Sequence, residues 1–204
     1  FAVGTTSMTF VDTSRATAAH GSVPAAPSRT LATTLVYPAQ GTPGGAVLSN
    51  AAGEMSAAPF PLIVLSHGLG GNQDVQNQPV DVSFVIDGVL AASSAPGSLL
   101  GNAIDGEVIA ASGHSNGAIT TYGLVANSCC RDQRIDAAIV LSGALSPFAG
   151  GVYDLADTPP MLVVHGVNDV LTNYNQAVRS YNQLLPPKGL LSLDESEHGS
   201  YLGP

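Results

Sequence analysis

The most reactive pattern in the chain is Gly113-His114-Ser115-Asn116-Gly117, which directly follows the apolar run 108–112. A Gly-x-Ser-x-Gly pentapeptide after a buried strand is typical of a nucleophile elbow, a turn so tight that only glycine fits on either side of the serine. Residues 118–125 can continue as the helix that such an elbow requires. The pattern predicts a nucleophilic hydroxyl at Ser115; the alternative is a small residue in a glycine-rich turn.

A carboxylate and a histidine follow further along the chain, each just beyond a predicted strand. Asp169 comes after the apolar strand 161–165, and His198 comes after the strand 190–193. Because the carboxyl ends of parallel strands meet at one edge of a sheet, we expect these two side chains to converge with Ser115. Serine is a poor nucleophile at neutral pH. His198 would take its proton, while Asp169 would orient the imidazole and stabilise the imidazolium.

Other residues compete for these roles. Three further carboxylates are rivals for the orienting acid: Asp154, Asp157 and Asp194. Asp169 is favoured because, of the four carboxylates, it alone directly follows a predicted buried strand. His198 has the alternative of an ordinary loop histidine. His67 and His165 stand in His-Gly pairs at strand ends, and we interpret both as neutral structural imidazoles that hydrogen-bond to backbone.

An oxyanion site is predicted where the strand 61–66 ends in the glycine-rich turn 67–72. The backbone N–H groups of Leu69 and of Asn116 are the expected donors, and such donors commonly contribute about 3 kcal/mol each to transition-state stabilisation. Three residues are expected to line the substrate pocket: His114, Gly68 and Gly70. Packing explains His114 equally well. The glycine-rich turn lacks the Lys and Ser/Thr of a phosphate loop, which argues against nucleotide binding.

These motifs resemble those of secreted α/β-hydrolases, in the group that contains dienelactone-hydrolase-like proteins, platelet-activating-factor acetylhydrolases and cutinase-like polyester hydrolases. The residues that carry the resemblance are the stretches 29–38, 65–71, 113–117 and 164–169 with Glu197-His198-Gly199. The resemblance implies hydrolysis of esters through an acyl-enzyme, without a metal or an organic cofactor. It assigns the same nucleophile, acid, base and oxyanion donors. Dienelactone hydrolases use cysteine as the nucleophile, so Ser115 favours the esterase and lipase side of the group.

The remaining pattern predicts the scaffold that positions these residues. Apolar strands alternate with helices, which is typical of an α/β-hydrolase fold: a mainly parallel central sheet with helices on both faces, here with an antiparallel N-terminal strand, as one domain over 1–204. The segment 39–59 is predicted to be a loop. The predicted strands are 3–11, 30–37, 61–66, 108–112, 135–142, 161–165 and 190–193, and the predicted helices are 80–90, 118–125 and 173–185.

One departure from the family concerns the sheet. The family places a helix and a further strand between the glycine-rich turn and the helix that precedes the elbow, a unit of about 30 residues. Here Gln73 runs into Asp74 and almost at once into the helix 80–90. Without that unit, two strands would lack their hydrogen-bonding neighbour. We therefore expect residues to be missing between Gln73 and Asp74, and the family also usually adds a closing helix after the position of Pro204.

Composition narrows the classes of partner. The 204 residues carry a net charge of −9 with only six Lys and Arg, and no basic cluster exists, which argues against nucleic acid and anionic membrane surfaces. No apolar run reaches the roughly 18 residues that a membrane helix needs. The first residue is Phe1, which fits a processed secreted protein or a trimmed chain. We expect a secreted monomer that acts on a small or polymeric ester.

Two questions stay open from the sequence. The adjacent Cys129 and Cys130 are buried thiols, a vicinal disulfide, or partners for two other cysteines, and the sequence has no C-x-x-C pattern.

Two functions also compete. The first is a serine carboxylesterase for short-chain, lipid or polymer esters. The second is an inactive hydrolase-like binding protein, or a damaged form that lacks part of its sheet.

Overall fold

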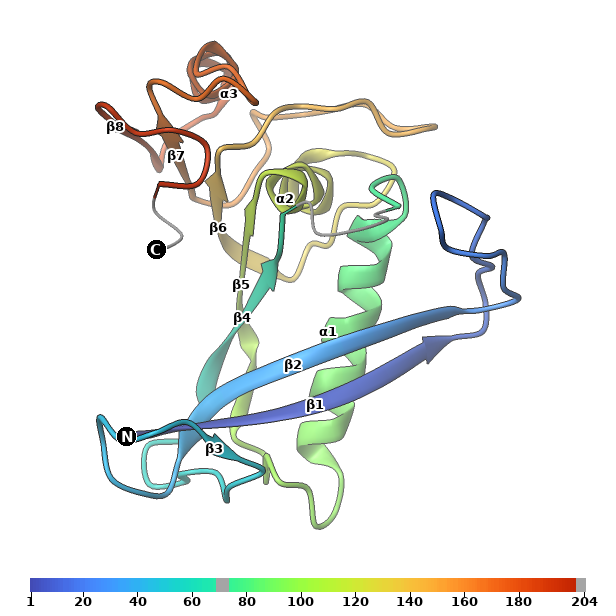
Figure 1. Ribbon diagram of the computed structural model, residues 1–204, viewed down its shortest axis with the longest axis vertical. Helices are drawn as coiled ribbons and strands as arrows, with labels where there is room; N and C mark the ends of the chain where they lie inside the picture. Colours follow the sequence, from blue (N-terminus) through green and yellow to red (C-terminus); the bar gives the residue numbers. More distant parts are fainter. Residues whose placement is uncertain (69–73, 201–204) are drawn as a thin grey trace. The chain divides into compact units, whose positions relative to one another are not determined.

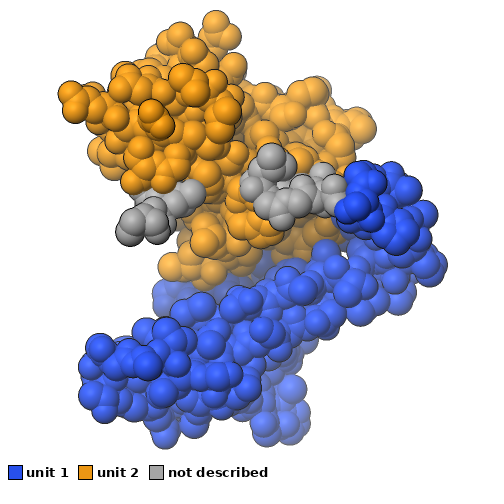
Figure 2. Space-filling view, viewed as in Figure 1, with its two compact units in different colours: residues 1–62, 83–107 blue, residues 63–82, 108–204 orange. Residues whose placement is uncertain are grey.

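The computed structural model describes residues 1–68 and 74–200. Contacts within the chain define two compact units (Figure 2). One unit comprises residues 1–62 and 83–107, and the other comprises residues 63–82 and 108–204. All the described candidate site residues belong to the second unit. The expectation of a single domain over 1–204 stays a prediction.

The first unit contains a long antiparallel pair of strands (Figure 1). Strand β1 (Ala2–Asp12) pairs with β2 (Arg29–Ala39) over its whole length, with Ala2 opposite Ala39 and Asp12 opposite Arg29. This confirms the predicted antiparallel N-terminal strand. A short strand β3 (Leu48–Ser49) pairs with β1 in parallel, inside the segment that was predicted to be a loop. Two residues are too few to carry a strand periodicity, so sequence reasoning missed it.

Helix α1 (Gln78–Ser94) follows the predicted helix 80–90 and extends it at both ends. Its apolar side is buried: Ile86 and Val89 have almost no exposed surface. Gly88 faces the ring of Phe10 on β1, and a Cβ at this position would overlap the ring. The close approach of helix and strand within the first unit therefore requires glycine here.

The candidate site depends on a five-stranded sheet with the order β4-β5-β6-β7-β8. Neighbouring strands from β5 to β8 are parallel, which confirms the predicted mainly parallel sheet. The connections include α2 (Asn116–Ala126) between β5 and β6, and α3 (Asn175–Gln183) between β7 and β8. The strands are β4 (Phe60–Ser66), β5 (Ile104–His114), β6 (Ile135–Leu141), β7 (Met161–Gly166) and β8 (Lys188–Leu193).

Two of the edge strands in the part of the chain that the structure describes expose large apolar side chains. Strand β4 ends the five-stranded sheet and exposes 69% of Ile63 and 68% of Leu65, while β2 ends the three-stranded sheet and exposes 69% of Val36. Edge strands with exposed apolar side chains fit the expectation of a missing helix-strand unit. Gln73, at the expected seam, lies outside the described residues, so the missing unit stays a prediction.

The two cysteines form a vicinal disulfide, Cys129–Cys130, just after α2. This is one of the three states that the sequence left open. The N–H of Cys129 also donates to the side-chain oxygen of Asn127, which is buried at the end of the helix. Over residues 1–68 and 74–200, the structure has no helix with the length and apolar character needed to cross a membrane.

Candidate active site

Ser115 lies on a sharp turn between β5 and α2. Its φ is 55° and its ψ is −118°, a conformation that residues other than glycine rarely adopt. The serine occupies the N-cap position of α2, yet its hydroxyl makes no capping hydrogen bond to that helix. A strained serine whose hydroxyl is not used as a helix cap is the geometry expected of a nucleophile elbow.

The glycines on either side of Ser115 allow this turn. A Cβ on Gly113 would overlap the carbonyl of Gly117, and a Cβ on Gly117 would overlap the carbonyl of Ser66 at the end of β4. Backbone cannot move aside as a flexible side chain can, so both positions require glycine. The sequence prediction for this pentapeptide is therefore matched by the local geometry.

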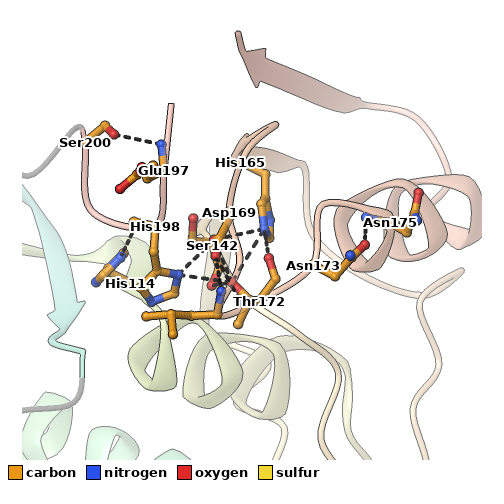
Figure 3. Close-up of polar contacts among 11 residues, drawn as sticks. His114, Ser142, His165, Asp169, Thr172, Asn173, Asn175, Glu197, His198 and Ser200 are labelled. Atoms are coloured by element: carbon orange, nitrogen blue, oxygen red, sulfur yellow. Dashed lines mark hydrogen bonds and ion pairs between the residues drawn. The ribbon is translucent and has the colours of Figure 1, made fainter. Parts of the chain in front are cut away.

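Asp169 and His198 form a hydrogen-bonded pair beyond the ends of β7 and β8 (Figure 3). His198 Nδ1 lies 2.8 Å from Asp169 Oδ2. The carboxylate is fully buried, while 15% of the imidazole is exposed. An imidazole held by a buried carboxylate at Nδ1 presents its other nitrogen, Nε2, for proton transfer.

The carboxylate of Asp169 is held by several donors from the same loop. The N–H groups of Leu171 and Thr172 each donate to Oδ1 at 2.9 Å. The hydroxyl of Thr172 lies 2.8 Å from Oδ2. Burial by itself raises the pKa of Asp169, but hydrogen bonds from the Thr172 N–H, His198 and the Thr172 hydroxyl outweigh it, so the pKa is held well below its usual range. The side chain is therefore ionised across neutral and moderately acidic pH.

His114 connects the loop that carries His198 to the turn that carries Ser115. Its Nε2 donates to the backbone carbonyl of His198 at 2.8 Å, and the two imidazole rings are 4.8 Å apart between centroids. Within the described residues, the Ser115 hydroxyl and the His198 imidazole share no hydrogen bond. Catalytic hydrogen bonds are often long or poorly aligned before substrate binds, and the role of His198 as the base stays a prediction.

The predicted oxyanion and pocket residues lie only partly in the described chain. Asn116 is the first residue of α2, where N–H groups have no partner within the helix. A Cβ on Gly68 would lie 3.3 Å from the Cβ of Ser115, so Gly68 borders the turn that carries Ser115. Leu69 and Gly70 lie outside the described residues, and their roles stay predictions.

Of the four carboxylates that compete in the sequence, Asp169 is the one hydrogen-bonded to His198. Asp154 instead accepts from the backbone N–H groups of residues 156 and 157, and Asp157 pairs with Arg131 at 2.6 Å. Asp194 contributes its backbone carbonyl to a turn. In the described ranges, no group of three or more His, Cys, Asp or Glu side chains is arranged to hold a metal ion.

Sequence reasoning missed two neighbours of the carboxylate. Thr172 contacts Asp169 through both its backbone and its hydroxyl, and His165 approaches Asp169 Oδ2 with its Nε2 at 3.2 Å. An aspartate that follows a strand often accepts backbone N–H groups two or three residues later, and this tendency could have indicated Thr172. His165 does bond to backbone as predicted, at the carbonyl of Thr172, but its contact with Asp169 carries no local signal.

No family model and no curated protein sequence matches this chain. Solved structures do. A ferulic acid esterase from Streptomyces cinnamoneus superposes with a TM-score of 0.66 at 21% identity, over 94% of this chain and 73% of that chain. The alpha/beta hydrolase GrgF from Penicillium sp. sh18 gives 0.61 at 11% identity, over 97% and 92%. A Paleococcus ferrophilus monoacylglycerol lipase gives 0.51 at 13% identity, over 69% and 88%. The chain has the α/β-hydrolase fold.

Proposed function

We propose that this chain is a serine carboxylic-ester hydrolase. The observation that carries the proposal is the hydrogen-bonded series Asp169–His198–His114, which ends at the residue before the strained Ser115. The three candidate groups come from the carboxyl ends of three different strands, which is where α/β enzymes assemble their sites. The ferulic acid esterase and the monoacylglycerol lipase with this fold add support, because both are named for hydrolysis of esters.

In the proposed reaction, the Ser115 oxygen attacks the ester carbonyl while His198 Nε2 takes the hydroxyl proton. The carbonyl oxygen becomes an oxyanion, which the N–H of Asn116 stabilises together with the predicted donor Leu69. Collapse of this intermediate breaks the ester bond, and the imidazolium gives its proton to the leaving alkoxide. Water then attacks the acyl-serine by the same route and releases the acid. Asp169 keeps the Nδ1 proton of His198 in place throughout.

The substrate class within this reaction stays broad: a short-chain ester, a lipid acyl ester or a polymeric ester. We also propose that the protein is secreted, and the disulfide Cys129–Cys130 supports this because disulfides persist in oxidising compartments. The alternative function is an inactive hydrolase-like binding protein. The observation that favours it is the exposed edge strand β4, which fits the expectation of an incomplete sheet.

The decisive experiment compares hydrolysis of p-nitrophenyl butyrate by the wild-type chain and by Ser115→Ala. We expect kcat of the variant to fall on the order of 10⁶-fold, because this is the scale of loss when the nucleophile of a catalytic triad is removed. A matched control is Ser7→Ala, because Ser7 is an exposed residue of β1 and belongs to the other compact unit. Its kcat should stay within about twofold of wild type, as is usual for substitutions away from special features.

A fluorophosphonate probe gives a second test that does not need turnover. One equivalent should attach to Ser115 in the wild-type chain and none in Ser115→Ala, as shown by mass spectrometry of the labelled peptide. Equal hydrolysis rates for wild type and Ser115→Ala, with no labelling of Ser115, would exclude the esterase and leave the binding protein as the better account.

A further inference from the structure

We propose that His165 is a positioning residue for Asp169: one buried N–H of its imidazole holds both the carboxylate and the loop that carries it. The inference rests on the proposed esterase function and deepens it, because it gives a second histidine a part in controlling His198. The sequence analysis treats His165 only as a structural imidazole. Its place at the end of β7, against the carboxylate of the site, indicates a more specific role.

His165, Thr172 and Asp169 contact one another (Figure 3). Its imidazole is fully buried, with Nε2 2.7 Å from the carbonyl oxygen of Thr172 and 3.2 Å from Asp169 Oδ2. Thr172 in turn donates its N–H to Asp169 Oδ1. The carboxylate, the threonine backbone and the imidazole therefore hold one another in place. Loss of the imidazole N–H would loosen the Thr172 carbonyl and one side of the carboxylate together.

The protonation state of His165 follows from its neighbours. The two atoms nearest to Nε2, the Thr172 carbonyl oxygen and Asp169 Oδ2, are acceptors, so Nε2 carries the proton. The other nitrogen, Nδ1, is buried and has no hydrogen-bond partner in the described part of the chain. A second proton there would lie unpaired in the interior, which is unfavourable. The Nε2 proton of His165 therefore faces the Thr172 carbonyl and the Asp169 carboxylate, while His198 carries the proton that is exchanged in the proposed reaction.

The N–H of His165 beside Asp169 Oδ2 affects the strength of the His198 interaction. Three groups lie against this oxygen and interact with its negative charge: His198 Nδ1, the Thr172 hydroxyl and His165 Nε2. Without His165, more of that charge acts on His198 and holds its imidazolium more strongly. The imidazolium then forms at higher pH and gives its proton less readily to the leaving group. Removing the donor should therefore lower kcat and move the acid limb of the pH profile to higher pH.

Other titratable groups face these two histidines and must be kept constant. His165 lies against Asp169 and against the ring of Tyr174, 6.0 Å away between centroids. His198 lies against Asp169 and the ring of His114, and its own loop contributes Glu197. Because these groups stay unchanged in variants of His165, differences between such variants report on His165 itself.

The test compares His165→Phe, which fills the space but removes the donor, with His165→Gln, whose amide nitrogen can take the place of Nε2. For p-nitrophenyl butyrate, we expect His165→Phe to lower kcat about tenfold with little change in KM, the scale of one charge-assisted hydrogen bond. Its acid limb should move up by about half a pH unit. His165→Gln should restore both the kcat, to within about threefold, and the position of the acid limb.

Nitrogen-15 NMR of the wild-type imidazoles gives a readout independent of activity. His165 should show a proton on Nε2 and none on Nδ1 between pH 5 and 8. A proton on Nδ1, or an equal loss of kcat in both variants with an unmoved acid limb, would overturn the proposal and leave a packing role. If the wild type shows no Ser115-dependent hydrolysis, the proposed function fails separately, and the NMR result alone decides the position of the proton. The same NMR measurement is the test of the proposal in the case where His165→Phe does not fold.

Discussion

The substitution Asp169→Asn tests the candidate site most directly, because the surroundings determine which way the new amide must face. Two backbone N–H groups, of Leu171 and Thr172, point at Oδ1. An amide NH₂ cannot accept from them, so the Asn oxygen takes that position. The NH₂ then occupies the position of Oδ2 and faces His198 Nδ1. This nitrogen must become an acceptor, which moves the imidazole proton to Nε2.

With its proton on Nε2, His198 cannot accept the proton of Ser115. The productive arrangement requires the amide to flip, and each of the two backbone N–H groups then loses its acceptor, at about 1–3 kcal/mol each. This range agrees with the effect of the equivalent substitution in serine proteases, about 10⁴-fold in kcat. We therefore expect kcat for p-nitrophenyl butyrate to fall about 10³- to 10⁴-fold, equivalent to about 4–5.5 kcal/mol.

The matched control for Asp169→Asn is Asp154→Asn, which removes one carboxylate from a loop turn outside the site. Its kcat should stay within about twofold of wild type. Thermal unfolding followed by circular dichroism checks that both variants are folded. A folded Asp169→Asn variant that keeps more than about a tenth of the wild-type kcat would refute the assignment of Asp169 as the orienting acid.

Three further predictions concern stability and association. Gly117→Ala should lower the free energy of unfolding by about 3 kcal/mol in a denaturant titration, because the new Cβ overlaps the Ser66 carbonyl; an unchanged midpoint would contradict this. The lowered pKa of Asp169 stabilises the folded chain at pH values above the ordinary carboxyl pKa of about 3.9. This stabilisation is lost as the pH falls below about 4. The unfolding free energy of Asp169→Asn should therefore fall less steeply between pH 5 and 3 than that of the wild type. Ile63→Lys on the edge strand β4 should reduce light scattering at high protein concentration, whereas Val152→Lys, in an exposed loop, should not; equal scattering would argue against β4 as a site of association.

Much of the fold could be predicted because its signals are local. Buried strands such as β7 are short apolar runs, and the turn around Ser115 is specified within five consecutive residues. The short β3 was missed, since two residues carry no periodicity. Helix and strand ends differed by a few residues from the prediction, because pairing and packing extend an element beyond its own sequence signal, as in β5.

The sequence by itself determined the sharp turn that carries Ser115, because the strain at Ser115 and the crowding at its flanking glycines arise among neighbouring residues and the strand ends beside them. It also predicted a carboxylate and a histidine just beyond the strands that the structure shows as β7 and β8. Only the tertiary structure decided which groups surround Asp169. His198 is 29 residues away from it, and the hydrogen bond from His114 to the His198 carbonyl spans 84 residues. Such contacts depend on how parallel strands align at one sheet edge, and no periodicity in the sequence records that alignment.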